Sequence, residues 1–116
     1  MDSVSIVIPA FNEERRLTAT LTAVLAYLAR RDWRFNEVVV VDDGSTDGTA
    51  RLVREFSARH PAVRLVENPG NRGKGYSVCH GVMEARGEWI LFSDADLSAP
   101  IEELDKLLAA AREGGV

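Results

Sequence analysis

Two kinds of segment alternate along the chain, and this alternation constrains the fold more than any other feature. Short runs rich in Val, Ile and Leu predict strands at residues 4–8, 37–41, 63–67 and 89–93. Apolar residues recur at helical spacing between the first two runs, at Leu17, Leu21, Val24, Leu25 and Leu28. The strands are apolar on both faces, which is typical of a parallel sheet covered on both sides. The sequence therefore predicts an α/β fold with a doubly wound, mostly parallel, Rossmann-like sheet.

The remaining helices are predicted from their ends and their apolar spacing. Asp47 is expected to cap a second helix that buries Val53 and Phe56 and ends before Pro61. A third helix is expected over residues 75–85 and a fourth after Pro100, over residues 101–111. We assign residues 1–116 to one domain, and we expect it to be truncated, because the chain stops where another strand of the repeating unit would begin.

Composition excludes several classes of protein. The chain has 18 acidic and 14 basic residues and a net charge of −4, so it offers no broad attraction to nucleic acid. Cys79 is the only cysteine, which excludes an internal disulfide and a Cys-rich zinc site. The apolar runs are too short to span a bilayer and no signal peptide is recognisable. These features predict a cytoplasmic location, with membrane contact at the cytoplasmic face only through a region beyond this chain.

Polar residues follow every predicted strand, which places them at the carboxyl edge of a parallel sheet. These polar residues, together with the small residues beside them, are Pro9, Ala10, Asn12, Glu13, Glu14, Asp42, Asp43, Asn68, Gly70, Asn71, Gly73, Lys74, Asp94 and Asp96. In doubly wound sheets, ligands bind outside this edge, near the point where the strand order reverses. The loops at the opposite edge contain no comparable set, so we expect the ligand site at the carboxyl edge.

The segment SDADLS suggests a metal site. Asp94 and Asp96 are two residues apart, so on an extended chain they point to the same side. Two convergent carboxylates repel each other unless a cation lies between or beside them, and hard oxygen ligands favour Mg²⁺ or Mn²⁺. Such a cation would bridge a nucleotide diphosphate. The alternative is a turn with ordinary helix-capping aspartates, because two aspartates at this spacing are common by chance.

The segment VVVVDDGSTDGT places two adjacent carboxylates, Asp42 and Asp43, at the end of a buried strand. A turn with positive φ at Gly44 and a helix cap at Asp47 explains the rest of the segment. It does not explain the acidic pair, of which at least one member needs a hydrogen-bond donor near low dielectric. The N–H groups of uracil or guanine would be such donors.

The segment NPGNRGKGYS adds two cations, Arg72 and Lys74, next to glycines that permit close backbone approach. These cations are candidates for phosphate or sugar contacts, and a solvated loop is the alternative. Neither the Walker A spacing nor a Gly-x-Gly-x-x-Gly motif after the first strand is present.

Four segments, SIVIPAFNEE, VVVVDDGSTDGT, NPGNRGKGYSVCHG and ARGEWILFSDADLSAP, occur in this order and spacing. Together they resemble family 2 of the glycosyltransferases, which has the GT-A fold. The similarity covers essentially the whole chain, and within the family it is greatest to polyprenyl (dolichyl)-phosphate glucosyl- and mannosyltransferases.

The resemblance implies roles for individual residues. One carboxylate of the acidic pair, with Asp43 favoured, would read the base, and Asp42 would lie close to the ribose or base. Asp96 would bind the metal, and Asp94 would lie near the ribose or sugar, with both taking part in catalysis. The implied nucleotide-sugar-binding set is Pro9, Ala10, Phe11, Glu13, Asp42, Asp43, Gly73, Lys74, Asp94 and Ala95. Phe11 stands where the family often has tyrosine.

The implied reaction transfers a hexose, glucose or mannose, from a UDP- or GDP-sugar with inversion at the anomeric carbon. The resemblance favours polyprenyl (dolichyl) phosphate as acceptor, and Mg²⁺ or Mn²⁺ would neutralise charge on the leaving diphosphate. Two alternatives remain: a fragment that binds a nucleotide sugar without turnover, and a transferase acting on a polysaccharide or cell-envelope glycan. The acceptor site would lie beyond residue 116, so we do not expect turnover from this chain alone. A phospho-accepting receiver domain is disfavoured, because its acidic pair should follow the first strand.

Overall fold

The computed structural model describes residues 2–95, and it contains four strands and three helices in strict alternation. The elements are β1 Ser3–Ala10, α1 Leu17–Leu28, β2 Phe35–Asp42, α2 Thr49–Arg59, β3 Val63–Glu67, α3 Lys74–Glu84 and β4 Trp89–Phe92. This order confirms the predicted α/β alternation. The helix predicted over residues 101–111 lies outside the described residues, as does Asp96.

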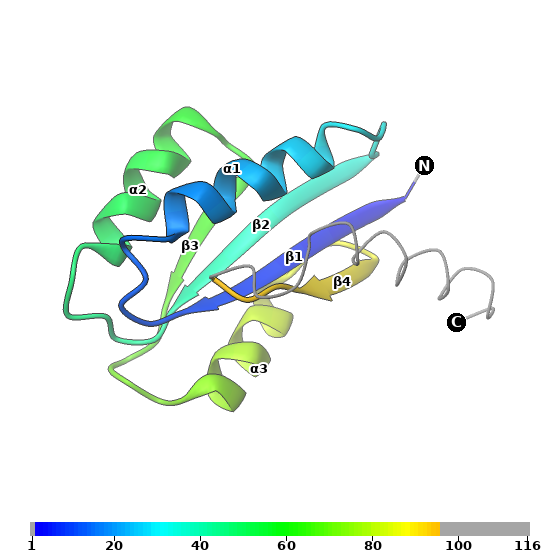
Figure 1. Ribbon diagram of the computed structural model, residues 1–116. Helices are drawn as coiled ribbons and strands as arrows, with labels where there is room; N and C mark the ends of the chain where they lie inside the picture. The colour runs from blue at the N-terminus through cyan, green and yellow to red at the C-terminus, as the bar shows by residue number, and fades with distance from the viewer. Residues whose placement is uncertain (1, 96–116) are drawn as a thin grey trace.

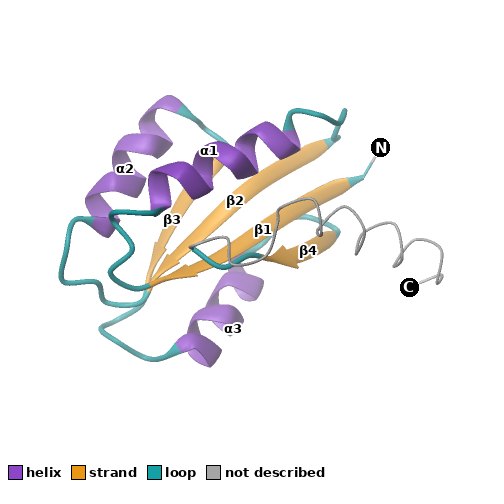
Figure 2. Ribbon diagram, viewed as in Figure 1, coloured by secondary structure: helices purple, strands orange, loops and turns teal. Residues whose placement is uncertain are grey.

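The sheet has the strand order β3-β2-β1-β4, and all of its strand pairs are parallel. In register, Val7 of β1 lies between Val39 of β2 and Phe92 of β4. Helices α1 and α2 cover one face of the sheet and α3 covers the other (Figure 1), which confirms the doubly wound arrangement. The chain moves outward from β1 to β3 and then returns to β4, so the strand order reverses beside β1. The loops that follow β1, β2 and β3 gather at the carboxyl edge (Figure 2).

Alternate residues of β1 supply two separate cores. Val4, Ile6 and Ile8 are fully buried against α1 and α2, together with apolar residues of those helices. Val7 is fully buried in the opposite core, with Val39 and other residues on the α3 side. Complete burial of such a side chain stabilises a fold by about 1.5–3 kcal/mol. Burial on both faces explains why the strands read as nearly continuous apolar runs.

The two helices on the first face differ in how they begin. Helix α1 packs through the predicted stripe, of which Leu17, Leu21 and Val24 are fully buried. In α2, Asp47 precedes the N-cap residue by one position, and its Oδ1 accepts a hydrogen bond from the Thr49 backbone N–H at 2.9 Å. Asp47 thus satisfies a donor of the first turn, but the N-cap position itself is Gly48, one residue later than predicted. Among the helices of residues 2–95, none is long and apolar enough to cross a membrane.

Helix α3 approaches the sheet through small residues. Ser77 and Gly81, four positions apart, are its buried residues. A Cβ atom on Gly81 would clash with Cγ1 of Val7, so only glycine fits at this contact. The helix begins at Lys74, one residue before the predicted start. This close packing fixes the height of the α3 amino end above the carboxyl edge of β1 and β2.

The amino edge of the sheet carries a buried carboxylate, Glu37. Its Oε2 accepts hydrogen bonds from the Ser5 hydroxyl and the Arg86 backbone N–H, both at 2.7 Å, and its Oε1 lies 3.2 Å from Arg64 Nη2. These contacts fasten the connection between α3 and β4 to the strands. They lie at the edge opposite the predicted ligand site and explain why polar residues occur inside β1 and β2.

Candidate functional site

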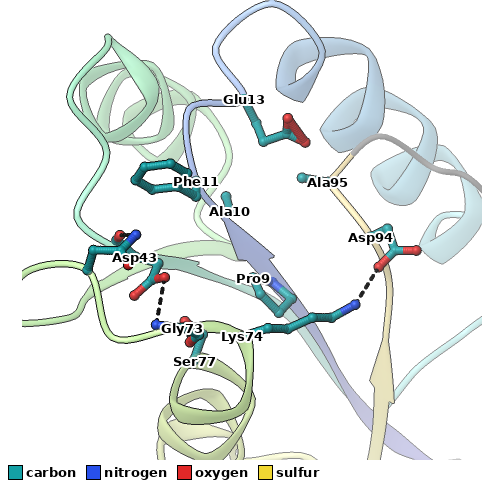
Figure 3. A pocket seen from close by; sticks show the side chains of 11 residues that line it. Pro9, Ala10, Phe11, Glu13, Asp43, Gly73, Lys74, Ser77, Asp94 and Ala95 are labelled. Atoms are coloured by element: carbon teal, nitrogen blue, oxygen red, sulfur yellow. Dashed lines mark hydrogen bonds and ion pairs between the residues drawn. The ribbon is translucent and has the colours of Figure 1, made fainter.

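A cavity of about 500 Å³ lies at the carboxyl edge of the sheet. Its lining residues are Pro9, Ala10, Phe11, Glu13, Asp43, Asn71, Gly73, Lys74, Ser77, Asp94 and Ala95. Figure 3 shows Pro9 and Ala10, at the end of β1, between Asp43 on one side and Asp94 on the other. The cavity therefore opens where the strand order reverses, as expected for doubly wound sheets. The structure brings together every residue of the predicted nucleotide-sugar set except Asp42.

Asp43 anchors the wall formed by the loop before α3. Its carboxylate is buried and accepts hydrogen bonds from the Arg72 backbone N–H at 2.7 Å, Asn68 Nδ2 at 2.9 Å and the Gly73 backbone N–H at 3.0 Å. Burial alone would raise the pKa of this carboxyl, but the bond from Arg72 and the other donors outweigh it and lower the pKa below its ordinary value. The donors that burial demands come from the protein itself. A contact between Asp43 and a base therefore stays a prediction from the resemblance.

Asp42 has a different environment from its neighbour. It is buried, and its Oδ1 accepts a hydrogen bond from the Ser45 backbone N–H at 3.2 Å, which closes the turn after β2. Its side chain does not line the cavity. Gly44 follows with the expected positive φ, 73°, and an added Cβ there would lie 2.6 Å from the Asn71 backbone nitrogen. The turn after β2 therefore supports the loop after β3, and a nucleotide contact of Asp42 stays a prediction.

Asn12 holds the loop after β1 against the loop after β2. Its φ is +52°, a left-handed conformation that asparagine tolerates better than most residues. Its Oδ1 accepts a hydrogen bond from the Thr46 backbone N–H at 2.8 Å, and its own backbone N–H donates to Ser45 Oγ at 2.9 Å. These bonds fix the backbone between Phe11 and Glu13, two residues that line the cavity.

Lys74 and Asp94 face each other across the cavity mouth. Lys74 Nζ lies 3.4 Å from Asp94 Oδ1, and the side chains are 74% and 48% exposed (Figure 3). A pair this exposed contributes little to stability, so a ligand can displace this contact at little cost. The next residue, Ala95, is buried, and its carbonyl accepts a hydrogen bond from the Thr20 hydroxyl of α1. This bond sets where the chain after β4 passes the cavity.

The described residues supply part of the predicted metal site. Asp94 offers a carboxylate at the cavity mouth, a hard oxygen ligand suited to Mg²⁺ or Mn²⁺. Within residues 2–95, no group of three or more His, Cys, Asp or Glu side chains could hold a metal by itself. The predicted ligand Asp96 lies outside that range. The carboxylate of Asp94 is thus compatible with a metal site to which Asp96 also contributes, and this site stays a proposal.

Sequence reasoning missed several residues of this site. Ser77 lines the cavity and belongs to no predicted set, whereas Asn71, which is expected at the carboxyl edge, lines it although it is not in the predicted nucleotide-sugar set. The signal for Ser77 is its spacing of four from Gly81, which marks a helix face of small residues that approaches the sheet. Asn68 and His80 lie behind the wall, and nothing in the sequence indicates that they contact each other.

Comparison with known proteins places the chain in a family. The family described as "Glycosyl transferase family 2" matches residues 5–116. The chain belongs to this family. It is 43% identical over 108 residues to a dolichyl-phosphate beta-glucosyltransferase of Trichomonas vaginalis, covering 87% of this chain and 31% of the relative. It is 40% identical over 116 residues to the Drosophila melanogaster protein of that name, covering 95% and 36%.

Solved structures show the same fold. The mannosyltransferase PcManGT of Pyrobaculum calidifontis, in complex with GDP-Man and Mn²⁺, superposes with a TM-score of 0.69 at 35% identity, over 80% of this chain and 27% of that one. TarS of S. aureus, in complex with UDP-GlcNAc, gives a TM-score of 0.71 at 32% identity, over 96% and 31%. These similarities confirm the GT-A fold expected for this family 2 chain. The chain spans about a third of the length of the relatives that it matches.

Proposed function

We propose that this family 2 chain is the donor-binding part of an inverting hexosyltransferase. The observation that carries the proposal is the cavity at the strand-order reversal, which is lined by all of the expected nucleotide-sugar residues except Asp42. Its volume of about 500 Å³ falls in the range usual for small-molecule sites. The donor would be a UDP- or GDP-sugar.

The wall beside Asp43 would receive the nucleoside. Phe11 is 46% exposed and lines the cavity, so it offers an apolar surface on which a base could lie. The backbone N–H of Gly73 is held by Asp43, and Gly73 itself has no side chain to obstruct a ligand. Lys74 at the mouth is suited to the diphosphate, because its ammonium is a mobile point charge.

Asp96 would hold Mg²⁺ or Mn²⁺ together with the diphosphate, with Asp94 near the ribose or sugar, and a bound cation would neutralise charge on the leaving group. The cavity residues would fix the donor so that an acceptor oxygen can reach the anomeric carbon. In the transfer, the bond from the acceptor oxygen to that carbon forms as the bond to the diphosphate oxygen breaks. Inversion at that carbon follows from direct displacement.

We propose polyprenyl (dolichyl) phosphate as the acceptor and glucose as the favoured sugar. The proposal is supported by the relatives from Trichomonas vaginalis and Drosophila melanogaster, both of which bear the name dolichyl-phosphate beta-glucosyltransferase. A lipid phosphate is already anionic near neutral pH, so it needs little help from a general base. Mannose remains the alternative sugar, because PcManGT was solved with GDP-Man.

Thermal unfolding with nucleotides tests the donor-binding role. A ligand at 100 times its Kd stabilises the folded state by about 2.7 kcal/mol, so a nucleotide that binds should raise the melting temperature of the chain. We expect UDP or GDP to do so only when Mg²⁺ or Mn²⁺ is present. Asp96→Ala should abolish this metal-dependent shift. Asp47→Ala, the control, should lower stability by about 0.5–2 kcal/mol and keep the shift. The absence of any shift with millimolar nucleotide would contradict the proposal.

The transfer reaction requires a second assay. The chain extended to the length of its relatives should transfer glucose from UDP-glucose, or mannose from GDP-mannose, to a polyprenyl phosphate. If the extended protein glycosylates only a polysaccharide, the lipid acceptor is wrong and the donor site stands. If the extended protein binds the nucleotide and transfers no sugar to either acceptor, it is a binding module.

A further inference from the structure

We propose that His80 and Asn68 are positioning residues that hold Asp43, and through it the wall of the nucleotide cavity. Neither residue lines the cavity. The inference rests on the proposed function only in assigning the cavity to a nucleotide. The hydrogen bonds among these residues do not depend on the proposed function.

Asn68 connects Asp43 to α3. Its side chain is buried, and its Nδ2 donates hydrogen bonds to Asp43 Oδ1 at 2.9 Å and to Ser77 Oγ at 2.8 Å. Ser77 Oγ in turn donates to the Gly73 carbonyl at 3.0 Å. Both N–H groups of the amide are therefore used, and a flipped amide would place its oxygen against the carboxylate. The orientation of Asn68 is thus determined by its partners.

His80 is a half-buried residue of α3 that contacts the side chain of Asn68. Its Nδ1 lies 2.7 Å from Asn68 Oδ1. Because that oxygen can only accept, Nδ1 must carry the proton, so neutral His80 is the Nδ1–H tautomer. The ring also meets Tyr76, one turn earlier in α3, edge to face at a centroid distance of 6.2 Å. Packing and hydrogen bonding thus agree on one ring orientation.

The bonds then reach the cavity wall. Asp43 Oδ1, which accepts from Asn68, also accepts from the Arg72 backbone, and Oδ2 accepts from the Gly73 backbone. Gly73 lines the cavity and has a φ of 95°, a conformation that glycine adopts readily. Hydrogen bonds thus run without interruption from His80 to the backbone that faces a ligand. Removing His80 would take the donor from the partly buried oxygen of Asn68, which weakens the hold on the amide that bonds Asp43.

Paired substitutions distinguish positioning from simple packing. His80→Phe keeps an aromatic ring beside Tyr76 and removes the donor, whereas His80→Asn keeps an N–H donor near the position of Nδ1. His60→Phe is the matched control, because His60 is exposed, stacks on Phe56 and ends α2 at the amino edge of the sheet. A residue that only packs would not be rescued by asparagine, which replaces the ring with a small polar group.

Two measurements test the contacts without any ligand. Nitrogen-15 NMR of the imidazole rings should show His80 as the Nδ1–H tautomer. Hydrogen exchange at the Gly73 amide should be about three- to tenfold faster in His80→Phe than in the wild type, as loss of one hydrogen bond implies, and close to wild type in His80→Asn. An Nε2–H tautomer, or unchanged exchange at Gly73 in His80→Phe, would overturn the inference. Because the tautomer is read in the wild-type chain, the test remains decisive even if His80→Phe does not fold.

Calorimetry with UDP or GDP and Mn²⁺ then measures the effect on the cavity. For the nucleotide that the wild type binds, we expect about three- to tenfold weaker binding in His80→Phe, recovery in His80→Asn and no change in His60→Phe. Equal affinity in all four proteins would refute the positioning role. If the wild type binds neither nucleotide, the proposed function fails, and the tautomer and exchange results alone decide whether His80 positions Asp43.

Discussion

Asp43 Oδ1 lies 2.7 Å from the backbone nitrogen of Arg72, so the residue that follows β2 directly holds the loop that precedes α3. The Gly73 backbone N–H donates to the other oxygen of the same carboxylate at 3.0 Å. This short loop contains Gly70 and Gly73 at φ values of 86° and 95°. A single buried charge thus orders a segment in which two residues adopt conformations that favour glycine.

The first prediction concerns that charge. Asp43→Asn keeps the size of the side chain, but its NH₂ group can no longer accept from the backbone N–H groups. We expect the free energy of unfolding to fall by about 1.5–3 kcal/mol near neutral pH, the usual contribution of hydrogen bonds to a charged group. Urea denaturation measures this loss. The control is Asp42→Asn, which should lose less, because within the described part of the chain the side chain of Asp42 accepts a single long backbone bond, from Ser45 at 3.2 Å.

The same carboxyl gives a pH dependence. Burial raises the pKa of Asp43, but its donors, the Arg72 backbone N–H foremost, lower the pKa below the ordinary value in the folded state. Its stabilising contribution is therefore fully present above the unfolded pKa, about 3.9, and disappears as pH falls through the folded pKa. The stability difference between wild type and Asp43→Asn should be constant from pH 7 to about pH 5 and shrink below about pH 4. Denaturation curves at pH 7, 4 and 3 would contradict this if the difference stayed the same.

The second prediction compares two glycines of α3. A Cβ at Gly81 would clash with Val7, whereas a Cβ at Gly75 would meet no atom within 4 Å. Gly81→Ala should destabilise the fold by about 1–3 kcal/mol through overpacking. Gly75→Ala should stabilise it by about 0.5–1 kcal/mol, because alanine favours helix. Thermal unfolding of both variants checks the contrast, and a stabilising Gly81→Ala would show that α3 can move away from the sheet.

The third prediction concerns the bond between α1 and the chain after β4. Thr20→Val keeps the shape of the side chain and leaves the buried carbonyl of Ala95 without its donor. We expect a loss of about 1–3 kcal/mol and weaker metal-dependent nucleotide binding, because Asp94 adjoins this anchor. Thr22→Val is the control: its exposed hydroxyl bonds the carbonyl of Thr18 within the same helix. That variant should change stability by less than about 0.5 kcal/mol and leave affinity unchanged.

The fourth prediction separates binding from stability at the cavity mouth. Lys74→Met should alter the free energy of unfolding by less than about 1 kcal/mol, because its pair with Asp94 is exposed. It should nevertheless weaken nucleotide binding and make the affinity less sensitive to salt, since one charge contact to the diphosphate is lost. Arg51→Met, which removes an exposed cation of α2 that pairs with Glu55, should do neither. Titrations at two salt concentrations would refute the role of Lys74 if both variants behaved alike.

Most of the fold could be predicted because the local signals agree with one another. Val38, Val40 and their neighbours predict β2 at once, and the apolar spacing of α1 admits one interpretation. The strand ends were less predictable. Ser3 begins β1 by pairing with Phe35 of β2, and its hydroxyl accepts from the Glu88 backbone N–H at 2.8 Å, 85 residues away in sequence. No local pattern reveals such a partner.

The location of the candidate site could be predicted from the sequence, but the contacts of its individual residues could not. Strand polarity alone brings Ala10, Asp43 and Asp94 to one edge. Choosing between Asp42 and Asp43 requires knowing which of the two adjoins the cavity, and that depends on the position of the loop after β3. The contact between Asn68 and His80 depends on the tilt of α3 above β1 and β2, which is set by packing at Gly81 and not by any motif.

The reversal of strand order beside β1 separates the residues that stabilise the fold from the residues that line the cavity. The cavity exists because the chain leaves β1 toward β2 and later returns to β4 on its other side, with α1 and α3 on opposite faces of the sheet. Phe11 and Asn71 protrude into this opening from exposed loops, outside both cores. Exchanging these two side chains would leave the buried valines of β1 and β2 undisturbed. A scaffold of this kind can acquire new ligand preferences through a few surface substitutions, with little penalty in folding.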